Sequence, residues 1–140
     1  MRARHILVVE DSDEDFDTIS DAAERAGVPH ALVRVHTGNE GLHLLQSASS
    51  NRHALPLLIL LDLNTPGDDG RAVLRDIRSE DALTALPIIV LSASDNPRDL
   101  HFCYANGANA YHVKPVHHAR HLQMLQQVFT YWLGAVVLPA

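Results

Sequence analysis

The chain has 140 residues, of which 46% are hydrophobic and 20% are charged, and its formal net charge is −6. This length and composition predict one soluble globular domain, and the negative charge argues against a nucleic-acid-binding surface, which requires clustered Lys and Arg side chains. No apolar stretch approaches the length of a membrane span or of a secretory signal, so we expect a cytoplasmic protein with no membrane partner.

Strands and helices are predicted to alternate along the chain. Short apolar runs typical of strands buried in a parallel sheet cover residues 5–9, 31–36, 57–61, 87–91 and 110–113. Segments with helical spacing or a helix-start signal follow these runs, at residues 13–26, 40–46, 71–78, 97–106 and 117–133. This alternation predicts an α/β fold, namely a flavodoxin-like, doubly wound parallel sheet of five strands in the order 2-1-3-4-5 with five helices on its two faces.

Several helix ends carry their own signals in the sequence. Ser12 is the predicted N-cap of the first helix, Gly27 is its stop, and Pro97 stands in the first turn of the fourth. No internal repeat or low-complexity segment interrupts the pattern. We therefore expect one domain over residues 4–133, followed by an apolar tail over 134–140.

Polar side chains gather where the predicted strands end. Glu10 and Asp11 follow the first strand, Asp62 follows the third, Ser92 the fourth, and the fifth leads into Lys114. The carboxyl ends of parallel strands lie at one edge of the sheet, and in the order 2-1-3-4-5 the first and third strands are neighbours. The three acids are therefore predicted to converge.

This set of side chains has a specific chemical use. Three carboxylates in one crevice repel each other, and Mg²⁺ relieves the repulsion with one or two carboxylates, a backbone carbonyl such as that of Asn64, and waters. Ser92 and Lys114 add a hydroxyl and a cation, which completes a cradle for a phosphoryl group that Asp62 can accept as an acyl phosphate. The sequence contains neither the nucleotide-binding motif G-x-x-x-x-G-K-[ST] nor a G-x-G-x-x-G motif after a strand. The phosphoryl group is therefore expected to come from another protein or a small phosphodonor.

At this point the chain closely resembles the receiver domains of two-component response regulators, over nearly its whole length. The resemblance rests on Glu10-Asp11, Asp62 with Asn64-Thr65-Pro66 and Asp69-Gly70, Ser92-Ala93, and Lys114-Pro115. It implies that Asp62 is the phosphoacceptor and a metal ligand, that Asp11 binds Mg²⁺ directly, that Glu10 holds metal-bound water, and that Asn64 offers its main-chain carbonyl.

The resemblance also assigns roles to residues near the ends of the fourth and fifth strands. Lys114 would be the counter-ion of the phosphoryl group, and its bond to Pro115 would be cis. Ser92 would move onto the phosphoryl group, and Tyr111 matches an aromatic switch whose ring turns inward on activation, although an aromatic ring there also suits simple packing.

Two departures from the family pattern are Thr65, where an apolar residue is usual, and Glu10, where many receivers have Asp.

A narrower likeness concerns the stand-alone regulators that are paired with phytochrome histidine kinases. It rests on the run 60–64, the long final helix and the tail 132–139. It predicts a single-domain regulator that a histidine kinase, such as a bacteriophytochrome, phosphorylates on Asp62, and that signals by protein contact. Two other classes stay open: a Mg²⁺-dependent phosphohydrolase with an aspartyl-phosphate intermediate, in which Asn64 occupies the place of the usual second acid, and a flavodoxin-like cofactor or interaction module.

The remaining features have ordinary interpretations. Cys103 has no disulfide partner and is expected to be a buried small hydrophobe. The acidic run 13–17 indicates a solvated helix start. His117 and His121 have the spacing of a helical metal pair but no third ligand at readable spacing, so a solvated helix face is favoured. The apolar residues of the final helix and tail either fold back or pair with a second copy, and we favour the homodimer.

Overall fold

The structure, a computed structural model, describes residues 4–139. Its centre is a fully parallel sheet in the order β2-β1-β3-β4-β5, as the sequence predicts. The strands are β1 (Ile6–Val9), β2 (Leu32–Val35), β3 (Leu58–Asp62), β4 (Ile88–Ser92) and β5 (Ala110–Val113). Val9 of β1 pairs in register with Leu61 of β3, so the residues that follow β1 lie beside the end of β3.

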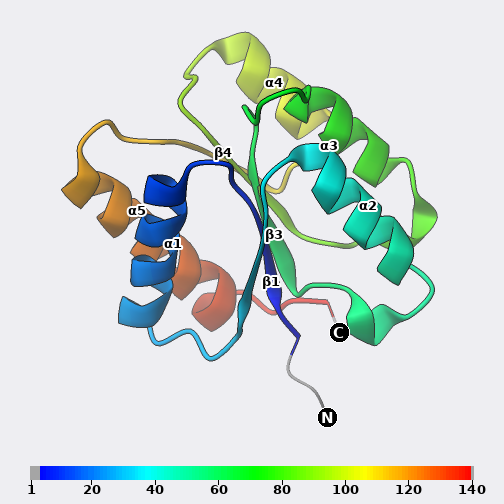
Figure 1. The fold of residues 1–140 in the computed structure, drawn as a ribbon, viewed down its shortest axis with the longest axis horizontal. Helices are drawn as coiled ribbons and strands as arrows, with labels where there is room; N and C mark the ends of the chain where they lie inside the picture. The colour runs from blue at the N-terminus through cyan, green and yellow to red at the C-terminus, as the bar shows by residue number, and fades with distance from the viewer. Residues whose placement is uncertain (1–3, 140) are drawn as a thin grey trace.

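Helices cover both faces of this sheet, as Figure 1 shows. One face carries α1 (Asp13–Arg25) and α5 (His118–Thr130), which pack against each other. The other face carries α2 (Gly38–Ala48), α3 (Gly70–Arg78) and α4 (Pro97–Ala105). Two short 3₁₀ helices, Arg52–Ala54 and Asp81–Leu83, lie in the connections that lead into β3 and β4.

The core consists of two apolar clusters, one on each side of the sheet. Every residue of β1, β3 and β4 is buried, because parallel strands in the middle of a sheet are covered by helices on both faces. Alternate residues face opposite clusters: Leu7 and Val9 lie in one, and Ile6 and Val8 lie in the other. Each such side chain contributes roughly 1.5–3 kcal/mol of burial free energy, which makes the edge of this sheet a rigid support.

Local sequence signals set most helix ends. Ser12 caps α1, with its Oγ accepting a hydrogen bond from the Asp15 amide at 3.1 Å, and Pro97 occupies the first turn of α4. α2 begins two residues earlier than predicted. The reason is a cap that the prediction missed, in which Thr37 Oγ1 accepts from the Glu40 amide at 3.2 Å.

The C-terminal segment folds back onto its own domain. After α5 the chain makes a π-helical turn, Tyr131–Ala135, so the helical segment ends later than predicted. Trp132 and Leu138 pack against the cluster beneath α1 and α5, and the Arg4 guanidinium donates to the Pro139 carbonyl at 3.2 Å. Figure 1 shows this segment, coloured red, passing below the sheet. No helix within residues 4–139 is long and apolar enough to cross a membrane.

Candidate functional site

Three carboxylates meet at the edge where β1 and β3 end. Glu10 and Asp11 follow β1, Asp62 is the last residue of β3, and one oxygen from each lies within 4.8 Å of the others. Glu10 is 1% exposed and Asp62 is 5% exposed, while Asp11 is half-buried. The predicted convergence is confirmed. Among the described residues this is the one group of three or more acidic, His or Cys side chains able to hold a metal ion, and its hard oxygen donors suit a divalent cation.

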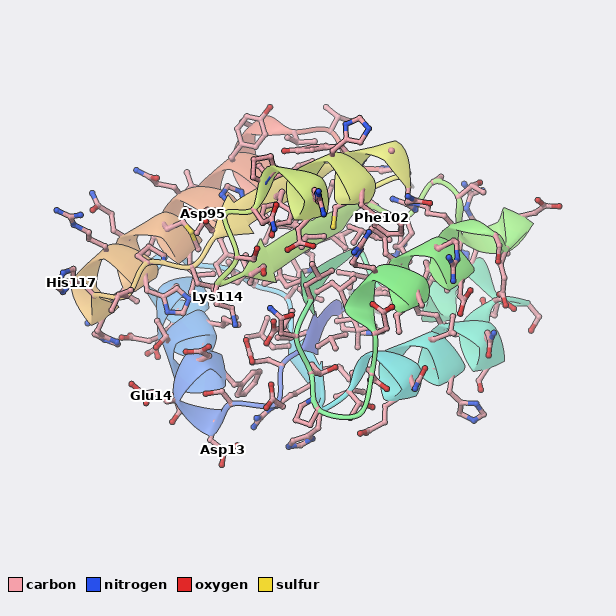
Figure 2. The ribbon with its side chains drawn as sticks, turned by 90° about the horizontal axis from the view of Figure 1, so that it is seen from above. Asp13, Glu14, Asp95, Phe102, Lys114 and His117 are labelled. Carbon is pink, nitrogen blue, oxygen red and sulfur yellow. The ribbon has the colours of Figure 1, made fainter. Side chains whose placement is uncertain are left out.

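Lys114 supplies the cation of the site. Its Nζ lies 2.8 Å from Glu10 Oε1, 3.0 Å from Asp15 Oδ2 and 3.2 Å from Asp62 Oδ2. Figure 2 shows Lys114 in the segment between β5 and α5, above α1. One ammonium group therefore joins three carboxylates from three parts of the fold: the segment after β1, the first turn of α1 and the end of β3.

Burial and mutual charge shift the pKa values of these groups. Burial, with a further contribution from the adjacent Asp62, raises the pKa of Glu10 from 4.5 to about 7, although Lys114 opposes the shift. Burial alone would lower the pKa of Lys114, but the Asp62 and Glu10 carboxylates outweigh it, so the pKa of Lys114 is raised. Lys114 is therefore cationic at neutral pH, whereas Glu10 is poised between its two protonation states.

The loop after β3 connects Asp62 to the end of β4. The Asn64 amide donates to Asp62 Oδ1 at 3.0 Å, and the Asn64 side-chain Nδ2 donates to Ser92 Oγ at 3.2 Å. Ser92 is fully buried, and its Oγ also accepts from the Ser94 amide at 3.1 Å. Ser92 and Asn64 thus lie in the site as predicted. The bond from the Asn64 side chain was not predicted.

The same loop is anchored to the start of α2. Thr65, 4% exposed, accepts a hydrogen bond from the Gly38 amide at 3.2 Å and donates one to Asp68 Oδ2 at 3.2 Å. Asp68 Oδ2 in turn accepts from the Asn39 amide at 3.0 Å. The two loop residues therefore satisfy two of the amide groups that the first turn of α2 leaves without a partner in the helix.

Gly70 closes this loop at its other end. A Cβ atom at Gly70 would collide with the backbone carbonyl of Leu63, so only glycine allows this close approach. The loop carrying Asn64 is consequently held at both ends, by Gly70 against Leu63 and by Thr65 against α2.

Tyr111 lies with its ring buried, at 9% exposure. Its hydroxyl donates to the Ser94 carbonyl at 2.9 Å, and its amide donates to the hydroxyl of Tyr104 on α4 at 3.1 Å. Tyr111 therefore ties β5 to the segment that follows Ser92 and to α4. Its role as a switch stays a prediction.

The structure corrects three expectations. Residues 4–139 contain no cis peptide bond, so the expected cis bond between Lys114 and Pro115 is wrong; trans is the lower-energy form, and Lys114 reaches Asp62 with it. Asp15 is not part of a solvated helix start, because its carboxylate pairs with Lys114. His121 is 6% exposed at the α1–α5 interface and not on a solvated face, while His117 is exposed. The packing of α5 on α1 buries His121 and leaves His117 exposed.

Comparisons with known proteins agree on one family. The family model described as the response regulator receiver domain matches residues 6–126. Response regulator Rcp1 of Synechocystis is 34% identical over 136 residues, covering 96% of this chain and 92% of that protein. The crystal structure of the Mn²⁺-bound form of response regulator Rcp1 superposes with a TM-score of 0.90 at 33% identity, covering 99% of this chain and 100% of that one.

Two further solved structures are similar. The phosphorylated cyanobacterial phytochrome response regulator RcpA has a TM-score of 0.89 at 35% identity, covering 99% of this chain and 100% of that chain. The bacteriophytochrome response regulator AtBRR has a TM-score of 0.69 at 31% identity, covering 92% of this chain and 96% of that chain. The likeness extends over nearly the whole length of each protein.

Proposed function

Because the chain belongs to the response regulator receiver domain family, we propose that Asp62 accepts a phosphoryl group in a Mg²⁺-dependent reaction. The family makes the chain a phosphoacceptor protein of two-component signalling rather than a conventional enzyme. The observation that carries the assignment to Asp62 is its buried carboxylate at the end of β3, which is 3.2 Å from Lys114 and within the acidic group. Its burial distinguishes Asp62 from the exposed acids of the chain and supports it as the acceptor.

Mg²⁺ is the proposed metal, held directly by Asp11, Asp62 and the main-chain carbonyl of Asn64, with Glu10 acting through a bound water. Three carboxylates within 4.8 Å of one another support a hard divalent cation at this place. When bound, the ion neutralises negative charge on the acids and on the incoming phosphoryl oxygens. Rcp1 is described in a Mn²⁺-bound form, which agrees with a divalent site.

The side chains of this chain divide the remaining work. An oxygen of Asp62 attacks phosphorus, the bond from phosphorus to the donor's leaving group breaks, and that group departs with the electron pair. Lys114 offers positive charge to the phosphoryl oxygens. The oxygen of Ser92 already accepts bonds from Asn64 and Ser94, so its own proton is free to be donated to a phosphoryl oxygen.

The change then passes outward from Ser92. Its Oγ is bonded to the Ser94 amide, and the Ser94 carbonyl is bonded to the Tyr111 hydroxyl, which makes a short chain of contacts from the site to β5. A movement of Ser92 onto a phosphoryl group therefore shifts the balance between two positions of the β4–α4 loop and Tyr111. This supports Ser92 and Tyr111 as the switch pair.

A sensor histidine kinase of the phytochrome type is the proposed phosphodonor. The support is the similarity to Rcp1, to the phytochrome response regulator RcpA and to the bacteriophytochrome response regulator AtBRR. The proposal places the chain in the cytoplasm, with its output carried by protein contact.

A homodimer through α5 and the tail belongs to the same proposal. Leu138 of the tail packs against its own domain, but Tyr131 is 58% exposed and Val137 is 95% exposed, which leaves apolar surface for a second copy. Sedimentation over a range of concentrations, with and without beryllofluoride, tests it. Monomers under both conditions would remove the dimer from the proposal.

The phosphoacceptor assignment is tested with acetyl phosphate and Mg²⁺, followed by intact-protein mass spectrometry. The expected result is the mass gain of one phosphoryl group, lost in Asp62→Asn and in the presence of a chelator. Asp76→Asn, an exposed acid on α3, is the matched control and should be phosphorylated as the wild type is. Labelling that persists in Asp62→Asn would contradict the proposal, and rapid hydrolysis of many small phosphoesters would favour the phosphohydrolase class.

A further inference from the structure

The ammonium group of Lys114 has three N–H donors, and each of its three neighbouring acids has a different place in the site. Asp62 and Glu10, at 3.2 Å and 2.8 Å, already have roles in the proposed chemistry. Asp15, at 3.0 Å, belongs to α1 and has no such role. Its contact with Lys114 is therefore unexplained by metal binding or by acceptance of the phosphoryl group.

Asp15 lies in the first turn of α1, where the helix N-cap holds its backbone in place. Its amide donates to the N-cap Ser12, which fixes the first turn of α1 immediately after the acidic pair. The side chains of Asp15 and Lys114 are 31% and 12% exposed, so the pair is largely withdrawn from solvent. The neighbouring Asp13, by contrast, is 87% exposed and pairs with Arg34, and Figure 2 shows Asp13 and Glu14 at the outer margin of the helix.

We propose that Asp15 is the positioning residue of Lys114, an inference that rests on the proposed function of Asp62. Acceptance of a phosphoryl group converts the Asp62 carboxylate into an acyl phosphate, and metal binding engages the Glu10 carboxylate through a metal-bound water. Asp15 is the one acid of the three whose own bonding changes in neither event. It therefore keeps the ammonium group aimed at the position of the phosphoryl oxygens throughout the reaction.

The physical need for such an anchor follows from the lysine side chain. Lys carries a compact charge on a flexible four-carbon stem, so its charge is spread over many positions unless another group holds it. Preorganised charge stabilises a transition state without the cost of reorientation. A carboxylate on a rigid, capped helix supplies that preorganisation from outside the reacting group.

The first test compares Asp15→Asn with Asp17→Asn, an exposed acid on the same helix that removes the same charge. With acetyl phosphate and saturating Mg²⁺, we expect Asp15→Asn to be phosphorylated about 3- to 10-fold more slowly, the range for a partly exposed charge-assisted bond. Asp17→Asn should match the wild type, and Asp15→Glu, which keeps a carboxylate, should recover part of the rate. Unfolding by denaturant, measured in parallel, shows whether each variant is folded.

The second test asks whether Asp15 acts through Lys114. In a Lys114→Gln background, adding Asp15→Asn should produce no further slowing, because the group that Asp15 positions is already gone. An equal slowing in both backgrounds would overturn the proposal, as would an unchanged rate for Asp15→Asn in a preparation whose wild type is phosphorylated.

A third measurement separates this inference from the proposed function itself. Side-chain NMR of the Lys114 ammonium group in the unphosphorylated protein reports the Asp15 contact without any phosphoryl transfer. We expect the resonance of the Lys114 ammonium group to shift, and the exchange of its hydrogens with water to speed up, in Asp15→Asn but not in Asp17→Asn. No change would overturn the positioning role, whereas a wild type that is never labelled on Asp62 would overturn the proposed function instead.

Discussion

The two rims of the Asp62 site are held by different kinds of interaction. The charged rim consists of Glu10, Asp15 and Lys114, and its bonds are ion pairs that cross from β1 and α1 to the segment after β5. The capping rim consists of Thr65 and Asp68, whose side chains accept hydrogen bonds from the first amides of α2.

This difference separates the part of the site that responds to changes in charge from the part that stabilises the surrounding structure. Protonation, metal binding and phosphorylation all change charge, and charge is what the charged rim senses, because its groups are largely buried and weakly screened. The capping rim consists of bonds to uncharged backbone groups, which those events leave intact. We therefore expect substitutions in the charged rim to alter chemistry and substitutions in the capping rim to alter stability.

The largest effect is expected for Lys114→Gln. This change removes the positive charge offered to the phosphoryl oxygens, and phosphorylation by acetyl phosphate should slow by about 100-fold, the scale for loss of one preorganised electrostatic contact. Intact-protein mass spectrometry over time measures the rate. A rate within twofold of the wild type would show that the charged rim is not the responsive one.

The second effect is a pH dependence that originates at Glu10. Glu10 has a pKa of about 7 in the folded, metal-free protein, so Mg²⁺ must displace a proton from it below that pH. The affinity for Mg²⁺ should therefore fall about tenfold per pH unit below 7. Titration calorimetry at several pH values measures this. Glu10→Gln has no proton to displace and should give a much flatter profile, and a wild-type profile equally flat would contradict the prediction.

The same shift predicts the stability of the metal-free protein. Because the pKa of Glu10 is raised from 4.5 to about 7 on folding, the folded state holds the proton more tightly than the unfolded chain. Its contribution, roughly 3 kcal/mol, is fully present below pH 4.5 and is lost as the pH rises through 7. Denaturant unfolding in the presence of chelator measures this effect. Between pH 4.5 and 7 the free energy of unfolding should fall with rising pH more steeply in the wild type than in Glu10→Gln.

A smaller effect is expected in the capping rim. Thr65→Val keeps the shape of the side chain but leaves the Gly38 amide without its partner, and should lower the free energy of unfolding by about 1–2 kcal/mol. Hydrogen exchange of the Gly38 amide should speed up in Thr65→Val and stay slow in Thr65→Ser, which keeps the hydroxyl. The phosphorylation rate should stay within about twofold of wild type. A tenfold loss would abolish the distinction between the rims.

The smallest effect is expected where charge is exposed. Asp13 pairs with Arg34 at 2.8 Å, but its side chain is 87% exposed, so Asp13→Asn should change the free energy of unfolding by less than about 0.5 kcal/mol. It should leave the phosphorylation rate unchanged, in contrast to Asp15→Asn two residues later. Thermal unfolding and the acetyl phosphate assay measure the two quantities, and a larger effect at Asp13 would mean that burial is not what makes the charged rim sensitive.

The sequence by itself determined the sheet and the central acids. Apolar runs marked β1, β3 and β4 most clearly, because a strand buried on both faces must be apolar along its length. The alternation of strands and helices along the chain led to the observed sheet order. Glu10, Asp11, Asp62, Ser92 and Lys114 were identified because each directly follows or ends a strand. The ends of parallel strands necessarily meet at one edge.

Tertiary structure alone decided the residues that support these groups. Asp15 and Thr65 act across elements distant in the chain, on Lys114 and on α2 respectively, and no local pattern encodes such a meeting. The burial of His121 and the return of the tail beneath the sheet likewise depend on how α5 packs against α1. Strand ends follow from local pattern and topology, whereas the partners of a helix surface depend on the angle and register at which whole elements pack.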